Sequence, residues 1–197
     1  MKSYSIILLA AGSSSRFGSP KQLAKIGLES FIQHAISESI KITGNAIVVL
    51  GANYDAIKKD IQNFPVELEY NKDWEEGMSS SIRCGLSASL NRDPLTEAVI
   101  FVVCDQPFLS SEIIEELIEK YESTKKPIIA CSYNKTAGTP VLFDKKYFDA
   151  LLNLKGPSGA KEIILQNEEE TARISFPLGS VDIDTKDDYN KLLNKSS

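Results

Sequence analysis

A loop of small residues, carrying two basic side chains, follows the first apolar run of the chain. Residues Ala10–Ser15 read Ala-Ala-Gly-Ser-Ser-Ser and lead to Arg16, Gly18 and Lys21. Small residues let the backbone approach a ligand closely, and successive N–H groups can bind phosphate oxygens beside the two positive charges. Gly18 is not followed by the Lys-Ser/Thr of a Walker A loop, and the G-x-G-x-x-G dinucleotide fingerprint is absent. The loop therefore predicts a phosphate site of another kind; the alternative is a flexible turn with solvated bases.

Carboxylates follow two later segments, in positions suited to a metal ion. Asp105 comes soon after the apolar run 98–103, and a carboxylate beside a phosphate loop can hold a Mg²⁺ ion that bridges phosphates. The alternative for Asp105 is a turn residue before Pro107. The segment Val181–Thr185 places alternate carboxylates on one face, and we expect Asp184 to be the second metal ligand. A helix cap is the alternative for that segment.

Three consecutive hydroxyl side chains stand at the start of a predicted helix after the third apolar run. Ser79, Ser80 and Ser81 lie within the segment 71–83. They can cap the helix, or they can contact a nucleotide or another anion at the helix N-terminus. Their position alone does not separate the two roles.

Composition excludes several kinds of site. The 197 residues are 42% apolar and 25% charged, which is typical of one folded domain, residues 1–197, and not of a disordered chain. The net charge of −5 argues against a nucleic-acid partner. His34 is the single histidine, so no histidine cluster can form, and we expect it to be a packed or surface residue. Cys84, Cys104 and Cys131 lack paired metal spacing and are typical of reduced thiols in a core.

Neither export nor a membrane span is expected. The apolar run Ile6–Ala11 is short and soon meets Arg16 and Lys21, and no later run approaches the roughly 20 residues that a membrane helix needs. We therefore expect a cytoplasmic protein that does not bind a membrane.

The apolar patterns predict an α/β fold in which strands and helices alternate. Continuously apolar strands indicate a mainly parallel sheet covered by helices on both faces, which is a single three-layer, doubly wound domain. The expected strands are Tyr4–Ala10, Ala46–Leu50, Val66–Tyr70, Ala98–Val103, Pro127–Cys131, Thr139–Phe143 and Thr171–Phe176. The expected helices are Ser30–Lys41, Ala56–Phe64, Met78–Leu90, Ser111–Tyr121, Tyr147–Leu154, Gly159–Gln166 and Thr185–Leu193. Since ligands in such sheets bind beyond the carboxyl ends of the strands, the segments above are expected to share one crevice.

Taken in order, these segments resemble the molybdenum cofactor cytidylyltransferases and the molybdopterin nucleotidyltransferase-like NTP transferases. The resemblance spans nearly the whole chain and rests on five segments in family order. They are the N-terminal segment Leu9–Leu23, Trp74–Arg83, Asp105–Pro107, Gly138–Phe143 and Asp182–Thr185.

The resemblance implies a nucleotide-diphospho-sugar-transferase-like fold, with a nucleotide-binding part (1–110) and an acceptor-binding part (111–197). The catalytic residues that it implies are Arg16, Lys21 and Asp105. The implied nucleotide-binding residues are Leu9, Ala10, Ala11, Gly12, Ser13, Arg16, Lys21, Ser80 and Ser81. The implied acceptor-binding residues are Gly138, Thr139, Pro140 and Lys161. Asp105 and Asp184 would bind Mg²⁺, or Mn²⁺ in its place.

The resemblance also bears on the substrates. Ala10-Ala11-Gly12 is similar to the cytidylyl enzymes of the family and favours CTP over GTP. Where the family pattern usually reads Gly-Asp-x-Gly-Ala-Arg, this chain has Gly156-Pro157-Ser158-Gly159-Ala160-Lys161, so an acid is absent and lysine replaces arginine. Lysine cannot reproduce the bidentate fork of arginine.

The function expected from this resemblance is transfer of CMP from CTP to the phosphate of molybdopterin, with release of pyrophosphate. A molybdoenzyme or its maturation chaperone would be the partner that receives the product. The alternatives are a cytidylyltransferase or guanylyltransferase for another phosphorylated acceptor, and a non-catalytic nucleotide-binding protein of the same fold. A nicotinamide-dependent dehydrogenase is disfavoured, because the glycine fingerprint is missing and no acid closes the second strand.

Overall fold

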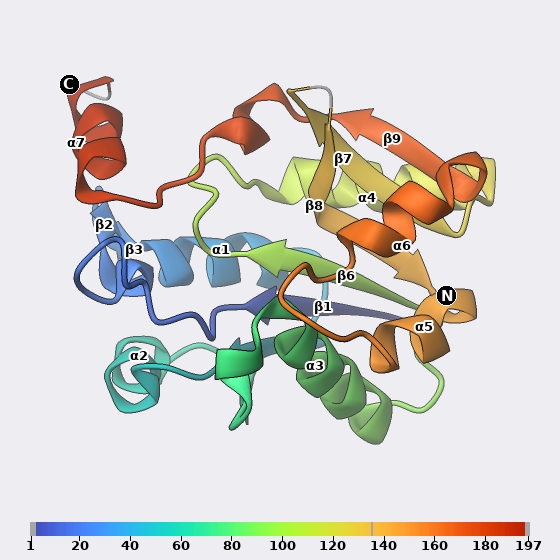
Figure 1. Cartoon of the computed structure of the whole chain (residues 1–197), viewed down its shortest axis with the longest axis horizontal. Helices are drawn as coiled ribbons and strands as arrows, with labels where there is room; N and C mark the ends of the chain where they lie inside the picture. Colours follow the sequence, from blue (N-terminus) through green and yellow to red (C-terminus); the bar gives the residue numbers. More distant parts are fainter. Residues whose placement is uncertain (1–2, 135, 196–197) are drawn as a thin grey trace.

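A seven-stranded mixed sheet forms the middle layer of the protein, in the order β5-β4-β1-β6-β8-β7-β9 (Figure 1). The computed structural model describes residues 3–134 and 136–195. The strands are β1 Tyr4–Leu9, β4 Ala46–Leu50, β5 Glu67–Tyr70, β6 Ala98–Val103, β7 Ile128–Tyr133, β8 Thr136–Asp144 and β9 Thr171–Ser175. Strand β8 runs against its neighbours β6 and β7, while the other neighbours in the sheet pair in parallel.

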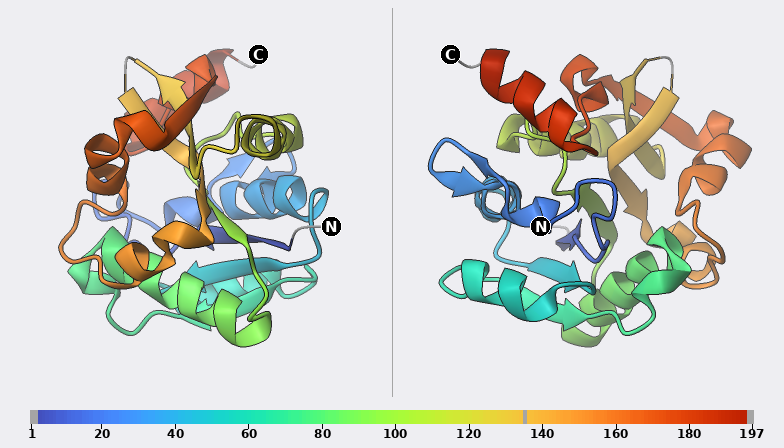
Figure 2. Two further views of the ribbon diagram at one scale, coloured as in Figure 1. Left: turned by 90° about the vertical axis from the view of Figure 1, so that its right-hand side faces the viewer. Right: turned by 60° about the vertical axis from the view of Figure 1, so that its left-hand side comes forward.

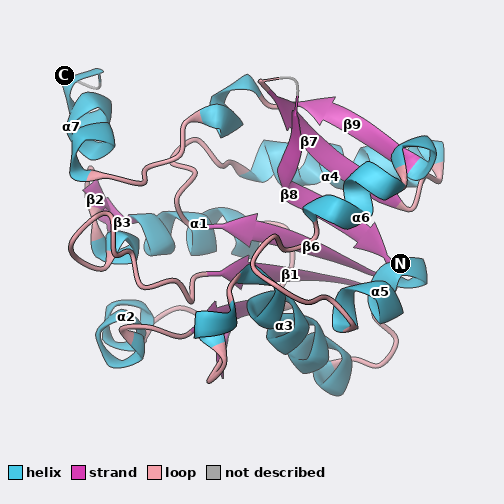
Figure 3. Ribbon diagram, viewed as in Figure 1, coloured by secondary structure: helices cyan, strands magenta, loops and turns pink. Residues whose placement is uncertain are grey.

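Helices cover both faces of this sheet, which confirms the predicted three-layer α/β architecture (Figure 2). One core cluster packs α1, α2 and α4 on one face, and a second packs α3, α5 and α6 on the other. The helices are α1 Phe31–Ile40, α2 Tyr54–Ile61, α3 Met78–Arg92, α4 Ser111–Thr124, α5 Phe148–Leu152, α6 Lys161–Gln166 and α7 Lys186–Lys195. Figure 3 shows the strands between the two helical layers. None of the described helices is both long enough and apolar enough to cross a membrane.

The central strands and the first helix follow the sequence closely. Strands β4 and β6 have the predicted bounds, and their side chains are almost all buried. Helix α1 begins after Ser30, whose hydroxyl accepts from the Gln33 backbone N–H while the Gln33 side chain accepts from the Ser30 backbone N–H. This reciprocal pair is a capping box. The buried faces of these elements fix the register of the parallel sheet.

Several boundaries differ from the expectation where the chain is half-exposed. Strands β7 and β8 extend to Tyr133 and from Thr136, beyond the apolar runs that predict them. The short connection between them is too brief for a parallel crossover, so the two strands pair antiparallel. The short hairpin of β2 (Lys25–Ile26) and β3 (Glu29–Ser30) was not predicted, because two-residue strands carry too little pattern.

Helix α3 lies unusually close to the sheet at Gly85. A Cβ atom built there would overlap the Ile7 Cγ2 atom of β1 and lie 2.8 Å from the Val49 Cγ2 atom of β4. The glycine therefore allows the start of α3, with its serines, to approach the carboxyl ends of β1 and β4.

Replacing this glycine should weaken the fold. Gly85→Ala is expected to lower the free energy of unfolding by about 1–2 kcal/mol, because overpacking costs about 1–3 kcal/mol while alanine regains up to about 1 kcal/mol of helix propensity. Urea unfolding followed by circular dichroism measures the change. Gly44→Ala is the matched control, since nothing lies within 4 Å of a Cβ at that position. Equal stability of the two variants would contradict the close contact of α3 with the sheet.

Candidate active site

The loop after β1 and the turn after β6 leave the sheet at the same edge. The two strands pair in parallel with Leu9 opposite Val103, so the residues that follow each of them emerge side by side. Lys21 lies on a short 3-10 helix at the end of the loop, and its Nζ atom is 2.5 Å from the Asp105 Oδ2 atom. Two of the predicted catalytic residues, 84 positions apart in the sequence, thus form an ion pair.

The segment before α7 adds the second predicted metal ligand to this ion pair. The Asp184 Oδ1 atom lies 3.2 Å from Lys21 Nζ, and the Asp184 Oδ2 atom lies 2.9 Å from the Arg16 guanidinium. The segment is anchored next to Asp184, because Ile183 is buried and its N–H donates to the Asp105 carbonyl at 3.2 Å. Arg16, Lys21, Asp105 and Asp184, which we call the charge cluster, are therefore brought together as expected.

Burial and neighbouring charges shift the pKa values of Lys21 and Asp182 in this region. Burial by itself lowers the pKa of Lys21, but attraction to the Asp105 carboxylate outweighs it and the pKa lies above its ordinary value. Burial raises the pKa of Asp182 to about 6, with repulsion from Asp105 and Asp184 adding to the effect. The Asp182 carboxyl is thus repelled by both Asp105 and Asp184, whereas the Lys21 ammonium contacts the latter two carboxylates.

The donor set of the charge cluster fits a hard divalent cation. Among residues 3–134 and 136–195, no group of three His, Cys, Asp or Glu side chains could hold a metal alone. Mg²⁺ is typically bound through one or two carboxylates, with substrate phosphates and water completing its octahedron. Asp105 and Asp184 would supply two such carboxylates, in place of their present contacts with the Lys21 ammonium.

A buried glutamine fixes the shape of the phosphate loop. The Gln22 side chain donates to the carbonyls of Ala10 at 3.0 Å and Gly12 at 2.8 Å, and it accepts from the Ser14 hydroxyl at 3.0 Å. Gln22 is 1% exposed. It was not among the predicted site residues, because a glutamine beside a loop has no distinctive signal in a single sequence.

The loop surrounds a small pocket on the side of the charge cluster. A cavity of about 160 Å³ is lined by residues of the loop and by Asp184; the lining residues are Gly12, Ser14, Ser15, Arg16, Lys21 and Asp184. Ser13 is exposed but does not line this cavity, and Leu9, Ala10 and Ala11 are buried at its base. Ala10 and Ala11 line neither this cavity nor the one described below, whereas Leu9 lines the latter.

The two predicted serines of α3 have partners within the protein. The Asn71 amide donates to the Ser80 hydroxyl at 2.8 Å and to the Ser81 hydroxyl at 3.0 Å, and Ser80 donates to the Gly77 carbonyl. All three polar side chains are buried. Their arrangement stabilises the first turn of α3, and a direct contact of Ser80 or Ser81 with a nucleotide stays a prediction.

A second buried glutamine joins the turn that carries Asp105 to two later segments of the chain. The Gln106 amide donates to the Thr139 carbonyl at 3.0 Å and to the Gly179 carbonyl at 2.9 Å. The turn that carries Asp105 is thereby joined to β8 and to the 3-10 helix Pro177–Ser180. Sequence reasoning missed Gln106, like Asn71, because its role depends on segments far away in the chain.

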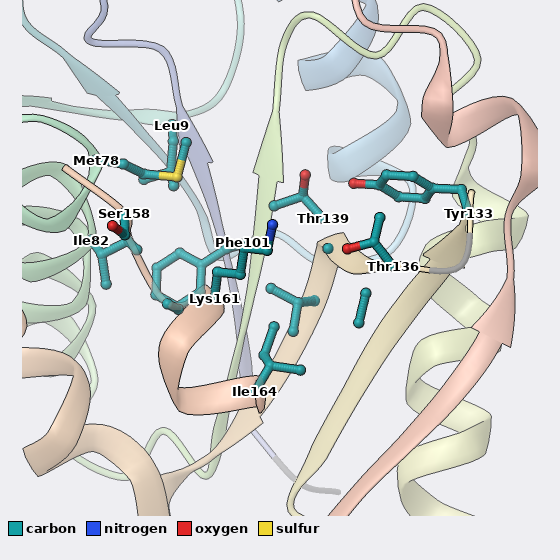
Figure 4. A pocket seen from close by; sticks show the side chains of 14 residues that line it. Leu9, Met78, Ile82, Phe101, Tyr133, Thr136, Thr139, Ser158, Lys161 and Ile164 are labelled. Atoms are coloured by element: carbon teal, nitrogen blue, oxygen red, sulfur yellow. The ribbon is translucent and has the colours of Figure 1, made fainter. Parts of the chain in front are cut away.

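Three of the four predicted acceptor residues line one cavity of about 300 Å³ (Figure 4). Gly138 and Thr139 come from β8, and Lys161 reaches in from the first residue of α6. Pro140 is buried and does not line the cavity.

The single histidine and the three cysteines lie apart from the charge cluster or are packed within the protein. His34 on α1 places its Nε2 atom 2.9 Å from the Leu109 carbonyl, in agreement with a packed role. Cys104 and Cys131 are buried, Cys84 is half-buried, and all three thiols are free.

Comparisons with known proteins identify a family and several relatives. The family model described as MobA-like NTP transferase domain matches residues 6–171. The nicotine blue oxidoreductase of Paenarthrobacter nicotinovorans is 27% identical over 171 residues, which is 81% of this chain and 80% of that protein. The molybdenum cofactor cytidylyltransferase of Escherichia coli K12 is 21% identical over 190 residues, which is 96% of this chain and 95% of that protein.

Solved structures have the same fold. The crystal structure of the Mycobacterium tuberculosis Rv0371c homolog from Mycobacterium sp. strain JC1 has a TM-score of 0.84 at 26% identity, and the match covers 99% of this chain and 98% of that one. Rv0371C of M. tuberculosis H37Rv, solved in complex with manganese, has a TM-score of 0.78 at 21% identity and covers 98% and 99%. The nucleotide-diphospho-sugar-transferase-like fold expected from the sequence is confirmed.

The role of Gln22 can be tested by removing its amide. Gln22→Leu is expected to lower the free energy of unfolding by about 1–3 kcal/mol, because the buried Ala10 carbonyl loses its side-chain donor. Urea unfolding measures this loss. Gln62→Leu makes the same substitution at the exposed residue that follows α2 and should change stability by no more than about 0.5 kcal/mol. A Gln22→Leu protein as stable as the control would show that the amide does not hold the loop.

Proposed function

Because the chain belongs to the family of MobA-like NTP transferase domains, we propose that it transfers CMP from CTP to the phosphate of a small acceptor and releases pyrophosphate. Molybdopterin is the first candidate for the acceptor, and another phosphorylated compound is the alternative. Residues 1–110 would bind the nucleotide and residues 111–197 the acceptor.

The charge cluster is the observation that carries this proposal. Lys21 and Arg16 contact Asp105 and Asp184 at the carboxyl ends of β1 and β6, which is where ligands of open α/β sheets bind. A reaction between two phosphate groups needs charge neutralisation and positioning above all, since both partners are anionic. A rigid group of two cations and two carboxylates, beside a loop of small residues, is suited to both tasks.

Each residue of the cluster has a distinct part in the proposed reaction. Arg16 and Lys21 would neutralise the triphosphate of CTP and the pyrophosphate that leaves. Arg16 is 73% exposed in its side chain and can turn toward an incoming nucleotide, whereas Lys21 is held by its two carboxylates. Asp105 and Asp184 would hold Mg²⁺ or Mn²⁺, which when bound supplies further positive charge to the phosphates. The manganese complex of the similar Rv0371C supports a divalent ion.

The acceptor needs no general base in this reaction. A phosphate monoester is largely ionised at neutral pH, so one of its oxygens can attack the α-phosphorus of CTP in line as pyrophosphate leaves. His34, on α1, forms a hydrogen bond with the backbone carbonyl of Leu109. A chain with a single histidine in a structural position is compatible with chemistry of this kind.

The choice of CTP rests on the loop and on one relative. Ala10-Ala11-Gly12 is similar to the cytidylyl members of the family, and the molybdenum cofactor cytidylyltransferase of Escherichia coli matches nearly the full length of the chain. One relative is named an oxidoreductase. Transfer is nevertheless favoured here, because the loop lacks the dinucleotide fingerprint and the charge cluster suits phosphate chemistry.

Removing either member of the central ion pair should reduce turnover. Lys21→Ala and Asp105→Asn are each expected to lower kcat for pyrophosphate release by about 10²–10³-fold, because each removes a charge that acts on the transition state. The measurement is a coupled pyrophosphate assay with CTP, Mg²⁺ and the phosphorylated acceptor, molybdopterin or another, with which wild-type protein releases pyrophosphate fastest. Lys59→Ala, on the exposed face of α2, is the control that should keep the wild-type rate. Normal turnover in both site variants, with circular dichroism showing folded protein, would contradict the assignment.

The base preference has its own test. Wild-type protein incubated with Mg²⁺, each of the four ribonucleoside triphosphates and a panel of phosphorylated acceptors that includes molybdopterin should release pyrophosphate fastest with CTP. Release with GTP alone would overturn the choice of base and leave nucleotidyl transfer intact. A rise in melting temperature with CTP, but no pyrophosphate with any acceptor, would indicate a nucleotide-binding protein without turnover.

A further inference from the structure

The cavity of the acceptor half has mostly apolar walls. The side chains of Leu9, Met78, Ile82, Phe101, Val141 and Ile164 form most of its lining. They come from β1, α3, β6, β8 and α6, so the walls are built from both halves of the chain. Its volume of about 300 Å³ is at the lower end of the range for small-molecule sites, about 300–1,000 Å³. The space suits one compact apolar group.

A single charged residue lines this cavity among residues 3–134 and 136–195. It is Lys161, and no described carboxylate forms an ion pair with its amine. Figure 4 shows the Lys161 side chain extending into the cavity with its nitrogen toward the side of Thr139. An ammonium that lies beside apolar walls without a counter-ion is suited to an anionic group of a ligand.

The side of the cavity that carries Thr139 is connected to the charge cluster through Gln106. The Thr139 carbonyl accepts from the Gln106 amide, and Gln106 follows Asp105 in the chain. An anion held by Lys161 near Thr139 would therefore face the proposed nucleotide site, while the rest of the molecule lies among the apolar side chains.

The hydrogen-bonding groups of the cavity are few and of one type. Besides Lys161, the polar side chains that line it are the hydroxyls of Tyr133, Thr136, Thr139 and Ser158. No Asp, Glu, Asn or Gln side chain of the described residues lines it. A ring whose edge carries amide and amine groups would lose its hydrogen bonds to water there, and an unpaired buried polar group costs about 1–3 kcal/mol.

We infer that the acceptor is a phosphate ester with a compact apolar body, aromatic or branched aliphatic, whose anionic group binds Lys161. This deepens the proposed function and rests on it, since it decides between the two acceptors left open there in favour of the alternative to molybdopterin. Lys161 and the apolar walls are then the residues that determine acceptor specificity. The Pro157 and Lys161 departures from the family pattern lie in the segment that enters α6, beside this cavity.

Binding measurements with a model ligand test the inference. We use 1-naphthyl phosphate as the apolar phosphate and glycerol 3-phosphate as the polar one, and measure affinities by isothermal titration calorimetry on the full chain. Wild-type protein should bind 1-naphthyl phosphate at least 10-fold more tightly than glycerol 3-phosphate. Lys161→Met keeps most of the aliphatic side chain and removes the charge. It should lower the affinity for 1-naphthyl phosphate by about 10-fold or more. Met78→Gln replaces a partly exposed apolar side chain of the cavity wall with a polar one. It should reduce the difference in affinity between the two ligands.

Two controls place the ligand. Lys155→Met removes an exposed charge from the same segment and should leave the affinity unchanged. Lys21→Ala should weaken binding less than Lys161→Met does, because Lys21 lines the other pocket. Loss of binding in Lys21→Ala with none in Lys161→Met would locate the ligand at the phosphate loop and overturn the inference, as would equal affinity for the two phosphates.

CTP binding to the same proteins separates the inference from the proposed function. If wild-type and Lys161→Met proteins bind CTP with Mg²⁺ equally, while 1-naphthyl phosphate behaves as expected, both stand. If CTP binds but 1-naphthyl phosphate shows no preference, the inference fails alone. If no CTP binds, the proposed function fails, and with it the inference that the cavity takes a nucleotidyl acceptor.

Discussion

The ion pair of Lys21 with Asp105 and Asp184 is the constraint on which the rest of the site depends. Burial raises the pKa of the neighbouring Asp182, and repulsion from Asp105 and Asp184 adds to this shift. The Lys21 ammonium opposes this shift and keeps its own pKa high despite burial. Since the partners come from the start, the middle and the end of the chain, the cluster can form only when the sheet, the loop and the C-terminal segment are all in place. The Lys21 ammonium and its two carboxylates are therefore in contact in the folded chain before a ligand binds.

Much of the fold could be predicted because its central strands are buried on both faces. Continuous apolar runs specify β4 and β6 to the residue, and the capping box at Ser30 specifies the start of α1. The order of strands in the sheet has no such signal, and neither has the direction of β8, because both depend on contacts between distant segments. Strand ends are also lost where residues such as Tyr133 and Thr136 are half-buried, since hydrogen bonding continues there beyond the apolar pattern.

Some residues of the candidate site could likewise be predicted from the sequence, and others could not. Arg16, Lys21, Asp105 and Asp184 could be predicted, because charged residues after strand ends are exceptions in an otherwise apolar pattern and topology brings strand ends together. Gln22, Asn71 and Gln106 could not, since an amide is common in loops and its value appears only when it is buried against two partners. The residues that carry charge are visible in the sequence, whereas the buried amides that hold them in place are visible only in the fold.

The two halves of the site work through different physical forces. On the nucleotide side, a small open pocket is lined by Arg16, Lys21 and backbone of the loop, so a triphosphate would be bound through charge. On the acceptor side, a larger cavity has apolar walls and one lysine, so most of its binding free energy would come from buried apolar area. Gln106, the residue after Asp105, connects the two pockets, because its amide donates to the Thr139 carbonyl in β8. Acceptor choice can therefore change through the wall residues while the charge cluster, and with it the chemistry, stays the same.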